Sequence, residues 1–416
     1  MQATPKSLRL HIGLFGRRNV GKSSLLNAIT RQQVSIVSAQ AGTTTDPVDK
    51  PMELLPLGPV QFVDTAGVDD EGALGELRIA RTRAVLDRVD LGLIVTGAGA
   101  WGDFEQALLA ELDHRKVPVL VVFNKSDLQA PLPEECQRVE GMGALPVAVS
   151  SLTGQGLSGL MAGLLKLAPK DFFDNQRLVA DLVPPGEVAI LVVPIDKEAP
   201  KGRLILPQVM TIRDLLDGES MALVVQEREL KHALDRLNRP PALVVTDSQA
   251  FLKVAGDVPK GIPMTSFSIL MARFQGNLAE QVRGTLGIER LKGGDTVLVA
   301  ETCGHHPVGE DIGRVKIPRW LTQFVGAKLQ FTHVQGRDFP QDLGPFSLVV
   351  HCGNCTGVRK EMTSRIHRCR EAGVPITNYG LTIAYSLGVF ERALAPFPDA
   401  LAAIEQERTR PDPKPR

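Results

Sequence analysis

The sequence has 416 residues, of which 43% are hydrophobic and 23% charged, with 47 basic and 47 acidic side chains. This length is too great for one hydrophobic core and predicts two or three domains of an ordinary globular protein. The even charge balance lacks the basic excess that non-specific nucleic-acid binding requires, so we expect no nucleic-acid partner.

No stretch is apolar for long enough to cross a bilayer, and the first residues lack the apolar segment of a signal peptide. We therefore expect a cytoplasmic protein with no membrane partner. Its five cysteines are then reduced thiols, for which metal binding is a better explanation than a disulfide framework when they cluster.

Apolar runs alternate with helical patterns in the first part of the chain, which predicts a doubly wound, largely parallel sheet. A polar stretch after Pro169 and the pair Pro184-Pro185 predict a linker, so the first domain is expected at residues 1–170. The expected strands are Leu8–Phe15, Val60–Val63, Leu91–Val95, Val117–Phe123 and Leu145–Val149.

A smaller α/β unit is expected at residues 178–260, and because it shows no cluster of titratable residues we interpret it as a dimerisation module. A third α/β unit is expected at 261–408, followed by a Pro-rich, charged tail at 409–416 that predicts disorder. The expected strands of the second unit are Val188–Val193, Met221–Val225 and Ala242–Thr246, with helices at Met210–Leu216 and Gln226–Leu237. Those of the third are Thr296–Ala300, Leu329–His333, Ser347–Val350 and Pro375–Thr377, with a helix at Val358–Ala372.

The stretch Gly16-Arg-Arg-Asn-Val-Gly-Lys-Ser23 is a complete P-loop between an expected strand and an expected helix. Its glycines let backbone N–H groups surround phosphates, and the helix N-terminus adds positive potential. Lys22 is expected to reach the β- and γ-phosphates and Ser23 to bind Mg²⁺. The expected nucleotide-binding residues here are Gly16, Asn19, Val20, Gly21, Lys22, Ser23 and Ser24.

Two further motifs specify the metal and the base. Asp64-Thr-Ala-Gly67 follows an expected strand, so Asp64 can hold Mg²⁺ through water and the Gly67 N–H can sense the γ-phosphate. Asn124-Lys125-Ser-Asp127 follows another, where Asp127 can accept hydrogen bonds from N1–H and the 2-amino group of guanine. Asn124 and Lys125 are expected to brace that loop.

The order and spacing of these motifs resemble the small GTPases, which implies GTP and GDP as ligands. By the same resemblance, Ser150 and Ser151 occupy the last base-binding loop, with Ser151 where alanine is usual. Gly42-Thr-Thr-Thr-Asp46 resembles the first switch of the tRNA-modification and ribosome-assembly GTPases, which implies Thr44 as a Mg²⁺ ligand.

The resemblance also implies that Asn19 takes part in a potassium site that supplies charge to the reaction. Apolar Val68 follows Gly67 where a water-orienting glutamine is found in Ras-type enzymes, so we expect slow hydrolysis, with Glu76 as a candidate helper. The residues expected to act in catalysis are Lys22, Thr44, Asp64 and Gly67.

Cysteines and histidines form two clusters near the other end, Cys303-Gly-His305 and His351-Cys352-Gly-Asn-Cys355. Each follows an expected strand, and the carboxyl ends of parallel strands share one edge, so the two clusters are expected to converge. Thiolate and imidazole ligands suit a closed zinc site or an iron–sulfur cluster, and the spacing alone leaves both possible. Cys136 and Cys369 are interpreted as packing residues.

A GTPase domain, a small middle domain and this C-terminal pattern together resemble the maturation GTPases of iron–iron hydrogenases. The resemblance covers essentially the whole chain. It implies a 4Fe–4S cluster held by Cys303, Cys352 and Cys355, with His305 or His351 at an exchangeable fourth position. It further implies a carrier that receives a diiron precursor from radical-SAM maturases and delivers it to apo-hydrogenase.

Two other hypotheses remain at this point. One is a regulatory GTPase of RNA or ribosome processing with a structural zinc domain, and the other is a GTP-dependent metallochaperone for another metalloenzyme. The predicted fold class is thus α/β with three domains: a P-loop GTPase, a small α/β module and an α/β domain that binds the metal cluster.

Overall fold

The computed structural model describes residues 5–30, 48–64, 85–169, 177–195, 202–302, 311–336 and 338–409. The chain divides into two compact units, Met1–Asn175 and Gln176–Arg416, which are described separately. Every helix in the described ranges is too short or too polar to cross a membrane.

The first unit is built on a six-stranded sheet in the order β2-β3-β1-β4-β5-β6. All neighbouring pairs are parallel except β2 and β3, which are antiparallel. The central strands are buried along nearly their whole length and are mostly apolar, as expected for a sheet covered on both faces. The strands are β1 (Leu10–Phe15), β2 (Val48–Leu54), β3 (Gly58–Asp64), β4 (Leu91–Gly97), β5 (Val119–Asn124) and β6 (Leu145–Ala148).

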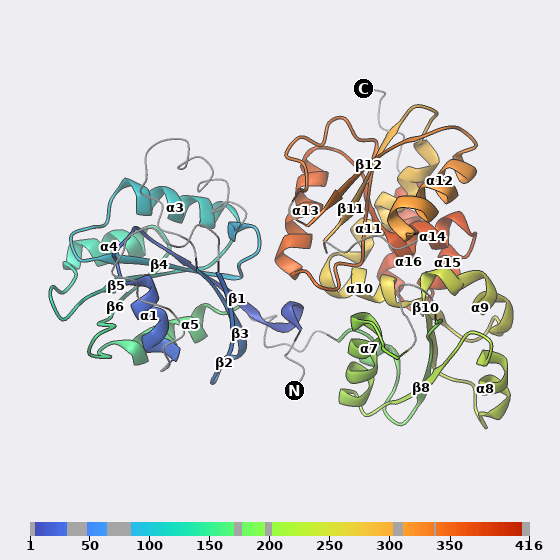
Figure 1. Ribbon diagram of the computed structural model, residues 1–416, viewed down its shortest axis with the longest axis horizontal. Coiled ribbons are helices and arrows are strands. Elements are labelled where there is room, and N and C mark those ends of the chain that lie inside the picture. Colours follow the sequence, from blue (N-terminus) through green and yellow to red (C-terminus); the bar gives the residue numbers. More distant parts are fainter. Residues whose placement is uncertain are drawn as a thin grey trace. The chain divides into compact units, whose positions relative to one another are not determined.

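Helices cover both faces of this sheet (Figure 1). Leu25 and Leu160 belong to the core on one face, and Leu108 and Val139 belong to the core on the other. The helices of the unit are η1 (Lys6–Leu8), α1 (Lys22–Thr30), α3 (Asp103–His114), α4 (Pro133–Gly141) and α5 (Leu157–Leu167).

The second unit contains two four-stranded parallel sheets, in the orders β10-β9-β7-β8 and β12-β11-β13-β14. One buried core extends from Leu178 to Ile404 and includes strand residues of both sheets. The strands are β7 (Val188–Val192), β8 (Met221–Val225), β9 (Leu243–Thr246), β10 (Met264–Ser266), β11 (Thr296–Glu301), β12 (Gln330–Gln335), β13 (Leu348–His351) and β14 (Ile376–Asn378).

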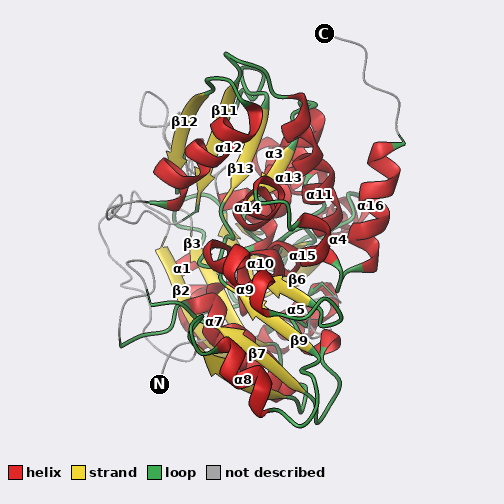
Figure 2. Cartoon of the chain, turned by 90° about the vertical axis from the view of Figure 1, so that its right-hand side faces the viewer, coloured by secondary structure: helices red, strands yellow, loops and turns green. Residues whose placement is uncertain are grey.

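Helices α10 and α14 lie between the two sheets of this unit (Figure 2), while α13 covers the opposite face of the C-terminal sheet through Met362 and Ile366. The helices of the first sheet are η2 (Ala180–Leu182), α7 (Leu206–Asp217), α8 (Leu230–Arg236), η3 (Ser248–Ala250), α9 (Phe251–Asp257) and α10 (Phe267–Gln275). Those that follow are α11 (Leu278–Leu286), η4 (Gly287–Arg290), η5 (Ile312–Lys316), α12 (Ile317–Val325), α13 (Arg359–Glu371), α14 (Tyr379–Ser386), α15 (Phe390–Leu394) and α16 (Pro398–Arg408).

The two sheets of the second unit repeat one topology: the first strand in chain order lies between the second and the third, and the fourth lies at the edge. The repeat is visible in the sequence where each last strand runs into a helix, as Gly-Ile-Pro-Met-Thr-Ser-Phe267 and Gly-Val-Pro-Ile-Thr-Asn-Tyr379. Ser266 and Asn378 cap α10 and α14 at equivalent positions. The middle and C-terminal sheets are therefore two versions of one supersecondary pattern.

The carboxyl ends of these sheets meet at a polar seam. Ser268 Oγ donates to Asn378 Oδ1 at 3.2 Å and accepts from the Gly380 N–H at 3.2 Å. A Cβ on Gly380 would lie 2.8 Å from Ser268 Cβ, so only glycine fits at this contact. Ser248 Oγ donates to Ser266 Oγ at 3.0 Å beside it.

The structure confirms the predicted α/β fold class. Strand β10 joins the middle sheet, which therefore continues past residue 260, the boundary that the sequence predicted. Strand β2 was also not predicted, because Asp49, Lys50 and Pro51 break its apolar pattern; proline is tolerated at this edge position. The tail beyond Thr409 lies outside the described residues.

Candidate nucleotide site and candidate metal centre

The P-loop joins β1 to α1 and has the backbone that phosphate binding requires. Gly16 has φ +141° and Gly21 has φ +92°. A Cβ on Gly16 would lie 2.2 Å from the Val95 carbonyl oxygen, and one on Gly21 would lie 2.3 Å from Asn124 Nδ2. Both positions therefore require glycine for conformation and for space.

Lys22 begins α1 and turns its ammonium group back into the loop. Its Nζ donates to the carbonyl oxygens of Gly16 at 2.7 Å and Arg17 at 2.8 Å. The positive charge thus sits within the turn of the P-loop, where the β- and γ-phosphates of a nucleotide would meet it.

Asn124, at the end of β5, holds the P-loop and the last base-binding loop together. Its Nδ2 donates to the Val20 carbonyl oxygen at 2.9 Å, and its Oδ1 accepts from Ser151 N at 3.1 Å and from Ser151 Oγ at 2.7 Å. Asn124 is 1% exposed, so these bonds satisfy a buried amide. The predicted bracing role of Asn124 has a direct geometric basis.

Lys125 and Asp127 lie in the turn that follows. Lys125 has φ +61° and donates from Nζ to the Asn19 carbonyl oxygen at 2.8 Å, which ties the base loop to the P-loop. Asp127 is exposed, so its carboxylate is available to a guanine base. Ser150 is buried, and its Oγ accepts from the Thr153 N–H at 3.1 Å, which shapes the loop.

Asp64 ends β3 and carries the carboxylate proposed for Mg²⁺. Its Oδ1 atom is buried and has no hydrogen-bond partner among the described residues. Burial raises the pKa of Asp64, against the opposing charges of Lys22 and Lys50. An oxygen ligand left in this condition fits a hard cation such as Mg²⁺.

Arg17 is a P-loop residue to which the sequence assigned no role. Its guanidinium donates to both carboxylate oxygens of Glu105, at 2.9 and 3.1 Å, and stacks 5.5 Å from the ring centre of Phe104. Glu105 is fully buried and also accepts from the Gly102 N–H at 3.0 Å. This bidentate pair fixes the P-loop to α3, and no spacing rule in the sequence would have found it.

Several predicted residues lie outside the described ranges: Thr44, Gly67, Val68, Glu76, Cys303 and His305. Their roles remain predictions. Among the described residues, no three histidine, cysteine, aspartate or glutamate side chains gather closely enough to hold a metal ion.

The described part of the cysteine site lies at the carboxyl end of β13. The chain runs from β11 to β12 on one side and reaches β13 on the other, so β11 and β13 flank the point where the strand order reverses. Open α/β sheets place their ligands at such a point. Thr302 follows β11 and Cys352 follows β13, so these two residues lie at this position.

Thr302 and Cys352 are in direct contact. The Thr302 N–H donates to Cys352 Sγ at 3.3 Å, and the Cys352 N–H extends the sheet by donating to the Ala300 carbonyl oxygen at 2.9 Å. Burial raises the pKa of Cys352, although the N–H groups of Thr302 and Asn354 oppose this effect. Binding of a metal ion to this thiol would displace its proton.

Asn354 sets the turn between Cys352 and Cys355. It has φ +55° and is 2% exposed. Its Oδ1 accepts from Thr302 Oγ1 at 2.7 Å, and its Nδ2 donates to the Val358 carbonyl oxygen at 3.1 Å. A Cβ on Gly357 would lie 1.9 Å from Asn354 Oδ1, so that glycine is needed for the amide to fit.

His351 has both ring nitrogens occupied. Arg365 Nη1 donates to Nε2 at 2.7 Å, and Nδ1 lies 2.8 Å from the Cys352 carbonyl oxygen. Arginine only donates and a carbonyl only accepts, so the ring is neutral with its proton on Nδ1. Burial lowers the pKa of His351 to about 3, and the Arg365 charge acts in the same direction.

A second set of buried polar contacts surrounds Glu301, which directly precedes Thr302. Glu301 is 6% exposed and accepts from Tyr379 OH at 3.1 Å and from Gln335 Nε2 at 3.0 Å. Burial raises the pKa of Tyr379 well above its ordinary value, with the Glu301 charge acting in the same direction. A Cβ on Gly313 would lie 2.2 Å from Tyr379 OH, so η5 needs glycine to pack here.

The remaining cysteines are core residues. Cys369 is fully buried against the C-terminal sheet, and burial raises its pKa to about 12. Cys136 is partly buried against the core on the α3 side of the first sheet.

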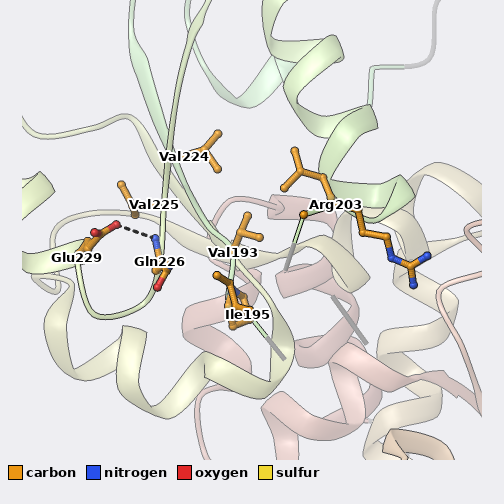
Figure 3. A pocket seen from close by; sticks show the side chains of 10 residues that line it. Val193, Ile195, Arg203, Val224, Val225, Gln226 and Glu229 are labelled. Atoms are coloured by element: carbon orange, nitrogen blue, oxygen red, sulfur yellow. Dashed lines mark hydrogen bonds between the residues drawn. The ribbon is translucent and has the colours of Figure 1, made fainter. Parts of the chain in front are cut away.

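A pocket of about 480 Å³ lies at the carboxyl ends of β7 and β8 (Figure 3). Val193, Ile195 and Val224 line it with apolar surface. Arg203 extends away from the other labelled side chains, and Glu229 accepts from the Gln226 N–H at 3.4 Å. The described lining thus gathers no group of charges that would define a ligand.

The fold and the P-loop motifs define a P-loop GTPase joined to a unit of two parallel sheets. The sequence model of the 50S ribosome-binding GTPase family matches residues 11–125. That of the hydrogen maturase F dimerization domain matches residues 178–276, and that of the hydrogen maturase F tetramerization domain matches 279–396.

The last two matches follow each other and together span more than half of the chain, so the chain belongs to the hydrogen maturase F family. Both of these domain matches fall within the second unit, and the GTPase match falls within the first.

Curated relatives match part of the chain. The tRNA modification GTPase MnmE of Bordetella avium is 39% identical over 160 residues, which are 38% of this chain and 34% of the relative. The GTPase Der of Wolinella succinogenes is 33% identical over 177 residues, which are 40% and 37% of the two chains. The chain thus spans little more than a third of the length of these relatives.

Solved structures that match include Aquifex aeolicus Era bound to GDP and aluminium fluoride, with a TM-score of 0.35 and 23% identity, covering 52% of this chain and 93% of that one. The G domain of the Thermotoga maritima iron transporter FeoB has a TM-score of 0.30 and 22% identity, covering 38% and 98%.

Proposed function

We propose that this protein is a carrier that holds a 4Fe–4S cluster, receives the diiron precursor of the hydrogenase active site and delivers it to apo-hydrogenase. One contact carries the proposal: the Thr302 N–H lies 3.3 Å from Cys352 Sγ. Cys303 follows Thr302 directly in the sequence.

The residues present fit an iron–sulfur group. Cys352 and Cys355 are partly buried against apolar core, and backbone N–H groups of Thr302 and Asn354 point to the Cys352 sulfur. Such N–H groups stabilise cluster sulfurs and tune reduction potential. Cys303, Cys352 and Cys355 would hold three irons, and the group would supply a fourth iron with an exchangeable position, for which His305 is the stronger candidate.

Precursor transfer provides the direct functional test. Full-length protein loaded by the radical-SAM maturases is expected to activate apo iron–iron hydrogenase after the maturases are removed. Hydrogen evolution by the recovered hydrogenase is the readout, with protein never exposed to the maturases as the matched control. Equal hydrogenase activity from loaded and unloaded protein would contradict the carrier role.

We also propose that GTP hydrolysis is slow and stimulated by potassium. Asn19 has φ +61° in the P-loop, and its carbonyl oxygen accepts from Lys125, so the residue is held at the rim of the phosphate site. Apolar Val68 cannot orient water. Turnover in potassium chloride is expected to exceed that in sodium chloride at equal ionic strength, and equal rates would refute the role of Asn19.

The second unit offers a surface for self-association. Strand β8 lies at the edge of its sheet, where Met221 is 52% exposed and Val224 42% exposed, and Leu216 next to it is 57% exposed. An exposed apolar edge strand pairs readily with a second copy. We propose a homodimer that forms here. Val224→Lys is expected to shift the sedimentation of the full chain toward the monomer, whereas an unchanged profile would place the interface elsewhere.

A further inference from the structure

The proposal concerns His351, which precedes the first cysteine of the Cys352–Cys355 pair and which the sequence offered as a possible cluster ligand. Successive residues of a strand point to opposite faces of its sheet. Along β13, Leu348 and Val350 belong to the core shared with the middle sheet, and Val349 belongs to the core beneath α13. The same alternation places His351 on the α13 face.

The two cysteines face the other way. Cys352 and Cys355 both pack against the core shared with the middle sheet. His351 instead meets Arg365, whose side chain rises from the middle of α13. The imidazole and the thiols therefore lie on opposite sides of the sheet edge.

Arg365 is held firmly where it meets the ring. It is 4% exposed, its Nη2 donates to the Gly336 carbonyl oxygen at 2.7 Å and to Glu361 Oε1 at 2.5 Å, and its guanidinium stacks 5.0 Å from the ring centre of Phe339. Freeing His351 Nε2 for a metal would remove one partner of a buried, permanently charged group. A buried charge that loses a partner is strongly destabilising.

We propose that His351 is a positioning residue that braces the Cys352 carbonyl group and so orients the cysteine turn, with Arg365 fixing its tautomer, and that it is no ligand of the cluster. This inference rests on the proposed function for the identity of the metal group. The bracing itself concerns the arrangement of the thiols and applies to any thiolate-bound metal.

The discriminating pair of variants is His351→Gln and His351→Leu. Glutamine can accept from Arg365 and donate to the Cys352 carbonyl, whereas leucine fills a similar volume and does neither. If His351 braces the turn, glutamine keeps metal affinity close to that of the native protein and leucine lowers it by about 10- to 100-fold, as loss of a group that orients ligands does. If His351 is a ligand, the two variants lose affinity equally.

Affinity is measured first with Co²⁺ on the metal-free full chain, because thiolate-to-cobalt absorption reports the cysteines whatever the native metal. His367→Gln is the matched control, since His367 lies on the same helix, is exposed and pairs with Glu371. Equal Co²⁺ affinities for the glutamine and leucine variants overturn the proposal.

Pulsed electron paramagnetic resonance of the reduced cluster gives a second measurement that needs no leucine variant. With ¹⁵N-labelled histidine, the native protein and His351→Gln are expected to show the same nitrogen couplings. A coupling present in the native protein and lost in His351→Gln overturns the proposal. If the native protein takes up no iron and sulfide, the proposed carrier function is contradicted. The Co²⁺ measurement still decides whether His351 braces the cysteine turn.

Discussion

The nucleotide site and the cysteine turn both lie at the carboxyl ends of parallel strands, but they are ordered by different means. The P-loop is held by bonds within the protein, from Lys22 to its own turn and from Asn124 to Val20 and Ser151. The cysteine turn is held by Asn354, which bonds to Thr302 and Val358, and these bonds leave the sulfur atoms to a metal ligand role. A phosphate site can thus have its final geometry before its ligand binds, whereas a thiolate site reaches its final geometry only when the metal binds.

The largest effect is expected when a cysteine of the Cys352–Cys355 turn is replaced. Cys352→Ala removes a thiolate that no neighbour can replace, so anaerobic reconstitution is expected to leave almost no bound iron. The matched control is Cys369→Ala, which removes a fully buried thiol in the core beneath α13 and is expected to retain iron. Iron per chain after desalting is the measurement, and equal losses in both variants would contradict the assignment.

A smaller loss is expected when the base-recognition carboxylate is changed. Asp127→Asn removes an acceptor for two guanine donors, and bonds to charged groups contribute about 1.5–3 kcal/mol each. We expect GTP to bind roughly 100-fold more weakly and xanthosine triphosphate to bind better. Fluorescent-nucleotide titration measures both affinities. Asp113→Asn, at an exposed position of α3, is the control, and unchanged GTP affinity in Asp127→Asn would exclude the guanine contact.

Asn124→Ala tests whether hydrogen bonds within the protein order the P-loop before a nucleotide binds. The change leaves the Ser151 N–H and the Val20 carbonyl without their partner, and a lost buried hydrogen bond costs about 1–3 kcal/mol. We expect the nucleotide-free first unit to unfold at a lower denaturant concentration and GDP to bind more weakly. Protease resistance of the unit without nucleotide reports the first effect; native resistance would show that these bonds do not order the loop.

The smallest expected effect is a pH dependence at the edge of the first sheet. Partial burial raises the pKa of Asp49, but the hydrogen bond from Lys6 and the charge of Arg88 outweigh it and hold the pKa below its ordinary value. The contacts of Asp49 with Lys6 and Arg88 thus stabilise the folded unit above pH 3.8, the ordinary pKa of the carboxyl group. This contribution is lost as the pH falls through the lower pKa that Asp49 has in the folded protein.

Asp49→Asn is accordingly expected to lower stability at neutral pH by about 0.5–1 kcal/mol and to flatten the acid dependence below pH 4. Denaturant unfolding of the first unit at neutral and acid pH measures both. A variant that retains the native acid slope would show that another carboxylate causes it.

The sequence could predict the nucleotide site because its determinants are local. Glycines at fixed offsets, a lysine and an Asn-Lys-x-Asp turn require no knowledge of distant packing. It could not predict the Arg17–Glu105 pair, which depends on how α3 crosses the sheet. Strand direction alone predicts that the two cysteine clusters converge, and this stays a prediction because Cys303 and His305 lie outside the described residues. The described neighbour of Cys303, Thr302, contacts Cys352.

The orientation of His351 was within reach of the sequence. Alternation along Leu348–His351 separates the imidazole from Cys352, whereas grouping residues by metal affinity places the two together. The sequence does not show which arginine bonds to His351. Arg365 and Arg368 lie on the same helix and both contact Phe339, and only the packing of that helix brings Arg365 to the imidazole. The paired Gly-x-Pro-x-Thr segments before α10 and α14 were also a visible signal of the repeated sheet.

The most direct test of the central claim is metal and acid-labile sulfide analysis of full-length protein purified without oxygen. The account predicts a brown protein with iron and sulfide in equal amounts, about four of each per chain as a 4Fe–4S group requires. A colourless protein with one tightly bound zinc and no sulfide would contradict it.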